Sequence, residues 1–150
     1  MRVFITGGDG LLGSNLVRVL LDRGYDIKVL VQPGRSANTL DNLPISLVEG
    51  DLLVPDQLLA AAEGCDAIIH AAANTSIWPP RIPNVRQVNI EGTKNILNVA
   101  ASLNVEKLVY IGTANSFSFG TRENPGHEDT PYIAGKYGLD YMDSKFEAHQ

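Results

Sequence analysis

The chain has 150 residues, of which 44% are hydrophobic and 19% charged, as in a folded domain with a sizeable core. Seventeen acidic residues against twelve Lys and Arg give a net charge of -5, so we expect no nucleic-acid partner. The single cysteine excludes an internal disulfide and fits a reducing compartment. No apolar run approaches the roughly 20 residues that span a bilayer, and the opening residues break too early for a signal peptide. A cytoplasmic protein without a membrane partner is therefore expected.

A glycine-rich stretch, Thr6–Gly13, lies between a short apolar run and a helix-patterned segment. Gly7 would permit a tight turn, Gly10 would let the backbone approach a pyrophosphate, and Gly13 would let helix and strand pack closely. The free N–H groups and the dipole of the new helix favour an anion. The alternative is an ordinary glycine-rich turn. We expect a dinucleotide site that includes Gly7, Gly10, Leu11, Leu12 and Gly13.

Strand and helix patterns alternate along the whole chain. Strands are predicted at Val3–Ile5, Ile27–Val31, Ile45–Val48, Ala67–His70 and Leu108–Ile111. Helices are predicted at Leu11–Arg23, Asp56–Ala62, Val85–Leu103 and from Asp140 to Gln150. The first helix should bury Leu12, Leu16, Val19 and Leu20, and the third should present Asn89, Thr93, Ile96 and Ala100 along one face. The alternation predicts an α/β fold with a parallel sheet, in which the loops Asn74–Pro83 and Ser116–Lys136 line a ligand crevice.

The end of the second strand bears on the choice of cofactor. Folds that bind NAD usually place Asp or Glu there, on the ribose 2′-OH. Here Gln32 follows the strand, and Arg35 lies in the next loop. An arginine can bind a 2′-phosphate, so we expect NADP, with NAD as the alternative. In the structural alternative, Arg35 is only a solvated loop residue.

Two further loops follow strand ends. Asp51 and Leu52 could meet the adenine edge, although Asp51 could equally cap a short turn. Small residues at the end of the fourth strand would let a ribose or nicotinamide approach the backbone; they are Ala71, Ala72 and Ala73. His70 is distant in sequence from the other two histidines, so no metal site is expected.

Tyr141 and Lys145 are one helical turn apart and therefore on one face. A free tyrosine phenol has a pKa of about 10, and a nearby ammonium favours the phenolate, which can then exchange a proton with a substrate oxygen. Tyr132 and Lys136 have the same spacing, but a proline and a glycine make that segment poor helix. Thr113, just past the fifth strand, is 28 residues before Tyr141 and only 19 before Tyr132. We expect Tyr141 and Lys145 to be the catalytic pair.

Several motifs together resemble the extended short-chain dehydrogenase/reductases, the NAD-dependent epimerase/dehydratase family with its dihydroflavonol-reductase-like branch. They are Thr6–Gly13, Asp51-Leu52, His70–Ala73, Val88–Thr93, Val109–Thr113 and Tyr141–Lys145. The resemblance spans the whole chain. It implies a Rossmann-type doubly wound parallel sheet for residues 1–150, incomplete at its C-terminus, and a smaller substrate domain built mainly from the second half of such proteins.

The resemblance also implies roles for individual residues. Thr113 takes the place of the hydroxyl residue that holds the substrate oxygen, with Ser116 as the alternative. Asn89 would hold a backbone carbonyl or a water, or would be purely structural. The expected function is that of an NAD(P)-dependent oxidoreductase or nucleoside-sugar epimerase/dehydratase.

Its substrate would be a small molecule with an alcohol or carbonyl group, such as a sugar nucleotide, ketone or aldehyde. A homodimer is compatible with this expectation. The alternative from another class is a redox sensor or scaffold that binds NADP without turnover.

Overall fold

The computed structural model describes residues 1–150 and divides into two compact units. The first unit consists of Met1–Ala72 and Thr93–Ile111, and the second of Ala73–Gly92 and Gly112–Gln150. None of the helices is both long and apolar enough to cross a membrane.

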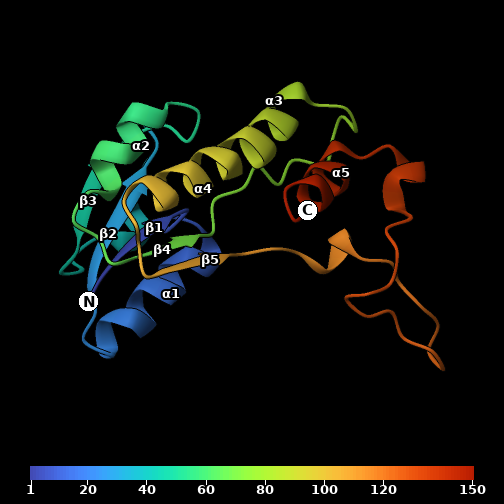
Figure 1. The fold of residues 1–150 in the computed structure, drawn as a ribbon, viewed down its shortest axis with the longest axis horizontal. Helices are drawn as coiled ribbons and strands as arrows, with labels where there is room; N and C mark the ends of the chain where they lie inside the picture. Colours follow the sequence, from blue (N-terminus) through green and yellow to red (C-terminus); the bar gives the residue numbers. More distant parts are fainter. The chain divides into compact units, whose positions relative to one another are not determined.

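The first unit contains a five-stranded parallel sheet in the order β3-β2-β1-β4-β5 (Figure 1). The strands are β1 (Arg2–Thr6), β2 (Asp26–Val31), β3 (Ser46–Glu49), β4 (Ala67–His70) and β5 (Lys107–Tyr110). Its helices are α1 (Leu11–Asp22), α2 (Pro55–Ala62) and α4 (Gly92–Ser102), with a 3-10 turn, η1, at Asn38–Leu40. The predicted parallel α/β sheet is confirmed, with each strand within two residues of its predicted bounds.

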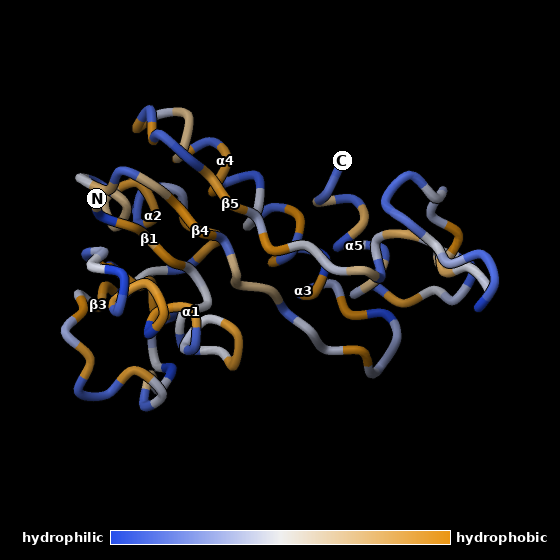
Figure 2. The backbone as a smooth tube through the Cα atoms, turned by 90° about the horizontal axis from the view of Figure 1, so that it is seen from below, coloured by the Kyte–Doolittle hydropathy of each residue, from blue (hydrophilic) through white to orange (hydrophobic).

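Helices cover both faces of this sheet, as a doubly wound fold requires. On one face, the core joins strand residues to Leu58 of α2 and Ile96 of α4, both fully buried. On the other face, strand residues pack with Val17 of α1 and Leu40 of η1. Figure 2 shows the hydrophobic stretches of β1 and β4 at the centre of the sheet. These strands are buried because neighbours flank them on both sides and helices cover both faces.

Helix α1 corrects one prediction. Leu12 is 57% exposed and Val19 43% exposed, whereas the buried residues of the helix are Gly13, Ser14 and Val17. The helix is therefore rotated from the predicted orientation, because its small residues allow its first turn to lie close against the glycine-rich loop. Leu12, predicted to be buried, lies instead at the open N-terminal end of the helix.

The second unit contains short helical segments and long connections. They are α3 (Pro83–Arg86), a π-helical segment η2 (Gln87–Glu91), the 3-10 turns η3 (Ala114–Ser116) and η4 (Ala134–Tyr137), and α5 (Asp140–Glu147). The predicted helix 85–103 is thus three successive segments, α3, η2 and α4. Its predicted face is confirmed, since Asn89, Thr93, Ile96 and Ala100 are all buried.

Candidate functional site

The glycine-rich loop of the first unit has the geometry of a backbone cradle. Gly7 has φ +72°, and a Cβ there would lie 2.6 Å from the Ala72 nitrogen. A Cβ on Gly13 would lie 2.0 Å from the Gly7 oxygen. Gly10 is exposed, and the nearest atom to a Cβ there would be 3.4 Å away. Gly7 and Gly13 therefore close the turn, while Gly10 leaves one side of it open.

Helix α1 begins directly after this loop, and no side chain caps its N-terminus. The first N–H groups of a helix lack intrahelical partners and carry the positive end of its dipole. Leu11 and Leu12 stand beside them, 87% and 57% exposed. The residues present thus fit a pyrophosphate, although their contact with a cofactor stays a prediction.

Two acidic side chains from other loops, those of Asp9 and Asp51, lie close to the residues that follow β2. Arg35 Nη1 lies 3.9 Å from Asp9 Oδ2, and the arginine side chain is 68% exposed. Gln32 Nε2 donates a 3.3 Å hydrogen bond to Asp51 Oδ2. The exposed guanidinium of Arg35 is therefore available to a 2′-phosphate, although the carboxylate of Asp9 lies beside it. The preference for NADP stays a prediction.

Residues in the two loops after β3 and β4 form hydrogen bonds and packing contacts that stabilise the fold. Asp51 Oδ1 accepts the N–H of Leu53 at 2.9 Å, which is the turn-capping alternative. Leu52 packs against the core of the first unit. Ala71 and Ala72 donate their N–H groups to the backbone oxygen and the hydroxyl of Thr6, while Ala73 begins the second unit. Contacts of these residues with adenine or nicotinamide stay predictions.

Helix α5 carries the predicted catalytic pair. Tyr141 is half-buried and lies in the first turn, whereas Lys145, one turn later, is only 4% exposed. Burial lowers the pKa of the Lys145 ammonium to about 8. The structure therefore places a poorly hydrated ammonium one turn from a partly accessible phenol.

The rival tyrosine is held by other groups. The Tyr132 hydroxyl donates to Asp143 Oδ1 at 2.7 Å, and its ring stacks on Phe146 with centroids 4.2 Å apart. Burial first, and then the Asp143 carboxylate, raise the pKa of Tyr132. Lys136 lies in the η4 turn and not on a regular α-helix. A raised pKa makes Tyr132 unsuited to act as a base, which favours Tyr141.

Asn89 joins α5 to the segment after β4. Its Nδ2 donates to the Asn74 carbonyl at 3.0 Å and to Ser144 Oγ at 2.9 Å, while its Oδ1 accepts the Asn74 N–H at 2.8 Å. Ser144 Oγ in turn donates to the Tyr141 carbonyl. Asn89 does hold a backbone carbonyl, but a role of this bond at the site stays a prediction beside the purely structural one. Its link to Ser144 was not predicted.

Two hydroxyls compete for the substrate-facing role. Thr113 Oγ1 accepts the Asn115 N–H at 3.3 Å and so caps η3. Ser116 is 2% exposed, and its hydroxyl has no hydrogen-bond partner. A capping hydroxyl still has a proton to donate, so the substrate-facing role of Thr113 stays a prediction, with Ser116 as the alternative.

His70 is a residue whose role the sequence did not reveal. Its Nδ1 lies 2.7 Å from Thr6 Oγ1 and its Nε2 lies 3.1 Å from Thr93 Oγ1, all of them buried. The histidine thus joins β1, β4 and α4 inside the first unit. Only the position of Thr93 on the buried helix face could have hinted at this contact.

Comparison with known proteins finds relatives that are named as reductases. The chain is 36% identical to a provisionally named dihydroflavonol 4-reductase of Synechocystis sp., over 98% of this chain and 43% of that protein. It is 32% identical to the 2-alkyl-3-oxoalkanoate reductase of Shewanella oneidensis, over 89% of this chain and 34% of that protein. The chain therefore spans less than half the length of these relatives.

Solved structures also match. The UDP-glucose 4-epimerase of Thermus thermophilus, crystallised with NAD, has a TM-score of 0.85 at 25% identity, over 99% of this chain and 49% of that one. The enzyme WbmG of Bordetella bronchiseptica, crystallised with NAD and UDP, has a TM-score of 0.81 at 25% identity, with 99% and 48% covered. The model of the NAD dependent epimerase/dehydratase family matches residues 3–150. With its glycine cradle, its parallel sheet and this match, the chain belongs to the NAD dependent epimerase/dehydratase family.

Proposed function

We propose that the full-length protein is an NAD(P)-dependent enzyme that oxidises or reduces an alcohol–carbonyl couple, as a reductase or as an epimerase/dehydratase. One observation carries the proposal: Lys145 is buried, with a lowered pKa, one turn from a half-buried Tyr141. Lysine is seldom fully buried, and groups with shifted pKa values are concentrated at functional sites. Family membership and the names of the relatives support the same class of reaction.

The cofactor is proposed to bind along the glycine-rich loop of the first unit. Gly7, Gly10, Leu11, Leu12 and Gly13 would hold its pyrophosphate, because the uncapped N-terminus of α1 attracts an anion. Arg35 would contact a 2′-phosphate and favour NADP. When bound, the cofactor supplies or accepts the hydride.

The second unit is proposed to supply the proton chemistry. Tyr141 would give a proton to the substrate oxygen during reduction and take it back during oxidation. The ammonium of Lys145 would favour the ionised phenol, and the hydroxyl of Thr113, or of Ser116, would donate to the same oxygen. Substrates would be small molecules with a carbonyl or alcohol carbon, and sugar nucleotides and 3-oxoalkanoates are the two classes that the relatives' names support. A cytoplasmic location and a homodimer stay predictions.

Two tyrosine variants test the proposal in the full-length protein. Tyr141→Phe should lower kcat by about 100-fold or more, because only the transferable proton is removed, while cofactor affinity by calorimetry should change little. Tyr132→Phe is the matched control and should leave kcat nearly unchanged. The probes are a 2-alkyl-3-oxoalkanoate with NADPH or NADH and UDP-glucose with NAD.

The same experiment separates the alternatives. Mass spectrometry of the nucleotide that copurifies distinguishes NADP from NAD. Nucleotide binding without turnover of any probe would favour a redox sensor or scaffold. If Tyr132→Phe were inactive and Tyr141→Phe remained active, the assignment of the catalytic pair would be overturned.

A further inference from the structure

The first turn of α5 is fastened to a segment about 60 residues earlier in the chain. Asp140 N–H donates to the Pro80 carbonyl at 2.9 Å. In return, the Ile82 N–H donates to Asp140 Oδ2 at 2.6 Å, and Arg81 Nη1 donates to Asp140 Oδ1 at 2.8 Å. Three hydrogen bonds thus tie one residue of the helix to three successive residues of another segment.

The Asp140 side chain is 6% exposed. Burial disfavours its ionised form, but the hydrogen bonds from Arg81 and from the Ile82 N–H outweigh burial, so its pKa is lowered. An ionised carboxylate in the first turn also interacts favourably with the helix dipole. The Asp140 carboxylate therefore remains ionised at neutral pH, and the contact with residues 80–82 (the fastening) includes an ion pair with Arg81.

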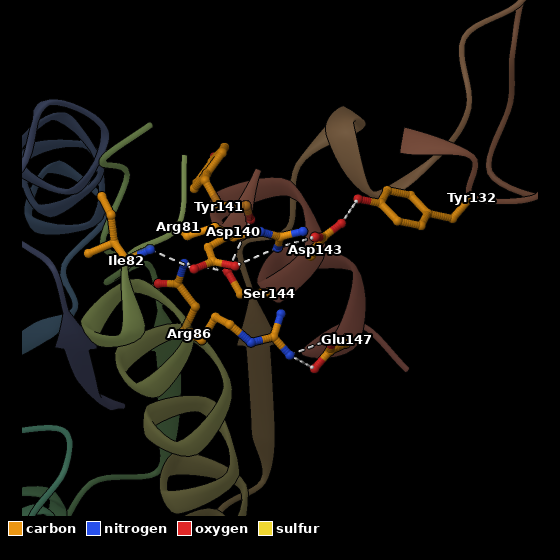
Figure 3. A network of polar contacts seen from close by, with 10 residues as sticks. Arg81, Ile82, Arg86, Tyr132, Asp140, Tyr141, Asp143, Ser144 and Glu147 are labelled. Atoms are coloured by element: carbon orange, nitrogen blue, oxygen red, sulfur yellow. Dashed lines mark hydrogen bonds and ion pairs between the residues drawn. The ribbon is translucent and has the colours of Figure 1, made fainter. Parts of the chain in front are cut away.

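Arg81 extends the contact to a second acid. The same nitrogen, Nη1, lies 3.1 Å from Asp143 Oδ2, and Asp143 also accepts the Tyr132 hydroxyl. Figure 3 shows Arg81 between the two carboxylates, with the Tyr141 ring directed away from these contacts. Because Asp140 and Asp143 are three residues apart, they share one face of the helix, and the opposite face is left to Tyr141.

These contacts hold the first turn of α5, and Tyr141 lies in that turn. We propose that Arg81 and Asp140 are positioning residues for Tyr141, which directly follows the fastened residue. This role rests on the proposed function: the fastening would hold the phenol in the orientation that proton transfer requires, without touching substrate or cofactor.

A purely structural role is the competing explanation, and α5 offers a matched control for it. At its other end, Arg86 Nη2 makes two contacts with Glu147, at 2.7 Å and 2.8 Å. That ion pair has the same chemistry on the same helix but lies at its last turn, away from Tyr141. The Arg86–Glu147 pair is partly exposed, and such pairs contribute little stability. Asp140 is buried, but it keeps the hydrogen bond from the Ile82 N–H when Arg81 is replaced, so both variants should remain folded.

The test uses the full-length protein with three variants, Arg81→Gln, Arg81→Lys and Arg86→Gln. Arg81→Gln should lower kcat about 10- to 100-fold, the effect of a small misplacement of a catalytic group, with cofactor affinity nearly unchanged. Its solvent deuterium isotope effect on kcat should rise, because proton transfer becomes slower. Arg81→Lys should restore much of kcat, since one nitrogen serves both carboxylates. Arg86→Gln should behave like the wild type.

Each outcome bears on one of the two proposals. Equal losses of kcat in Arg81→Gln and Arg86→Gln, or unchanged kcat in Arg81→Gln, would overturn the positioning role alone. No turnover of the 3-oxoalkanoate or UDP-glucose probes by the wild type would overturn the proposed function and this role with it. Faster hydrogen–deuterium exchange in α5 of Arg81→Gln than of Arg86→Gln would support the fastening directly.

Discussion

The two units are stabilised in different ways. In the first, aliphatic and aromatic side chains fill both faces of the sheet, and only a few polar residues are buried. In the second, the only buried apolar residues are Val85 and Ala134, whereas the buried polar residues are Asn89, Ser116, Ser118, Asp140, Ser144 and Lys145. Hydrophobic burial is non-directional, but hydrogen bonds fix distances and angles. The unit that carries α5, with the proposed catalytic pair, is thus the one held by directional contacts.

The largest expected effect on this contrast comes from the centre of the sheet. Phe4 is fully buried in the first unit. Phe4→Ala should lower the free energy of unfolding by about 3–5 kcal/mol, through lost transfer energy and the cavity left behind. Urea unfolding of the full-length protein measures this loss. A loss below about 1 kcal/mol would mean that the sheet is not the main source of stability.

In the second unit, a change to an apolar residue should have the opposite sign. Lys145→Met removes a buried ammonium whose folded pKa is lowered from 10.5 to about 8. Each unit of this shift corresponds to about 1.4 kcal/mol, so the gain in stability is at most about 3 kcal/mol, and activity should be lost.

The pH dependence of this gain follows from the protons bound. Between about pH 8 and 10.5 the unfolded chain keeps a proton on Lys145 that the folded chain has released, so wild-type stability rises with pH there. The advantage of Lys145→Met should be complete below pH 8 and absent above about pH 10.5. Urea unfolding at pH 7 and pH 10.5 measures it, and an advantage that grows with pH would contradict the assignment.

The smallest of these effects compares two asparagines. Asn89→Ala leaves the Asn74 N–H and carbonyl and the Ser144 hydroxyl without this partner, and should cost about 2–3 kcal/mol. Asn95, in the first unit, donates to the Leu52 carbonyl alone, and Asn95→Ala should cost about 1 kcal/mol. Thermal unfolding of both variants tests the ranking. Equal losses would show that directional contacts matter no more in the second unit than in the first.

The same contrast explains what the sequence could reveal. Strands such as Ala67–His70 are short apolar runs between turns, and the structure places them where the pattern predicted. The prediction of the buried face of α1 was wrong. The pattern considers only apolar residues, whereas the small residues Gly13 and Ser14 are buried because they allow close packing. Periodicity is a local signal, and it works where burial alone determines the structure.

The candidate site was only partly accessible to such reasoning. The glycine spacing and the Tyr141–Lys145 pair are local patterns and could be identified. The partners of Asp140 lie about 60 residues earlier in the chain, and nothing in the local sequence marks them. Asn89 was considered for its helix face, but its bond to Ser144 joins residues 55 apart and could not be anticipated.

The three bonds between Asp140 and residues 80–82 also limit how this protein can be redesigned. The loop that precedes α3 would be an obvious target for grafting a new specificity, because it is long and exposes Ile77 and Trp78. Its last residues, however, also form hydrogen bonds with the helix that carries the proposed catalytic pair. A transplant that replaced the whole loop would alter recognition and reaction geometry together. Exchange confined to residues 75–79, with Pro80, Arg81 and Ile82 retained, would keep the two apart.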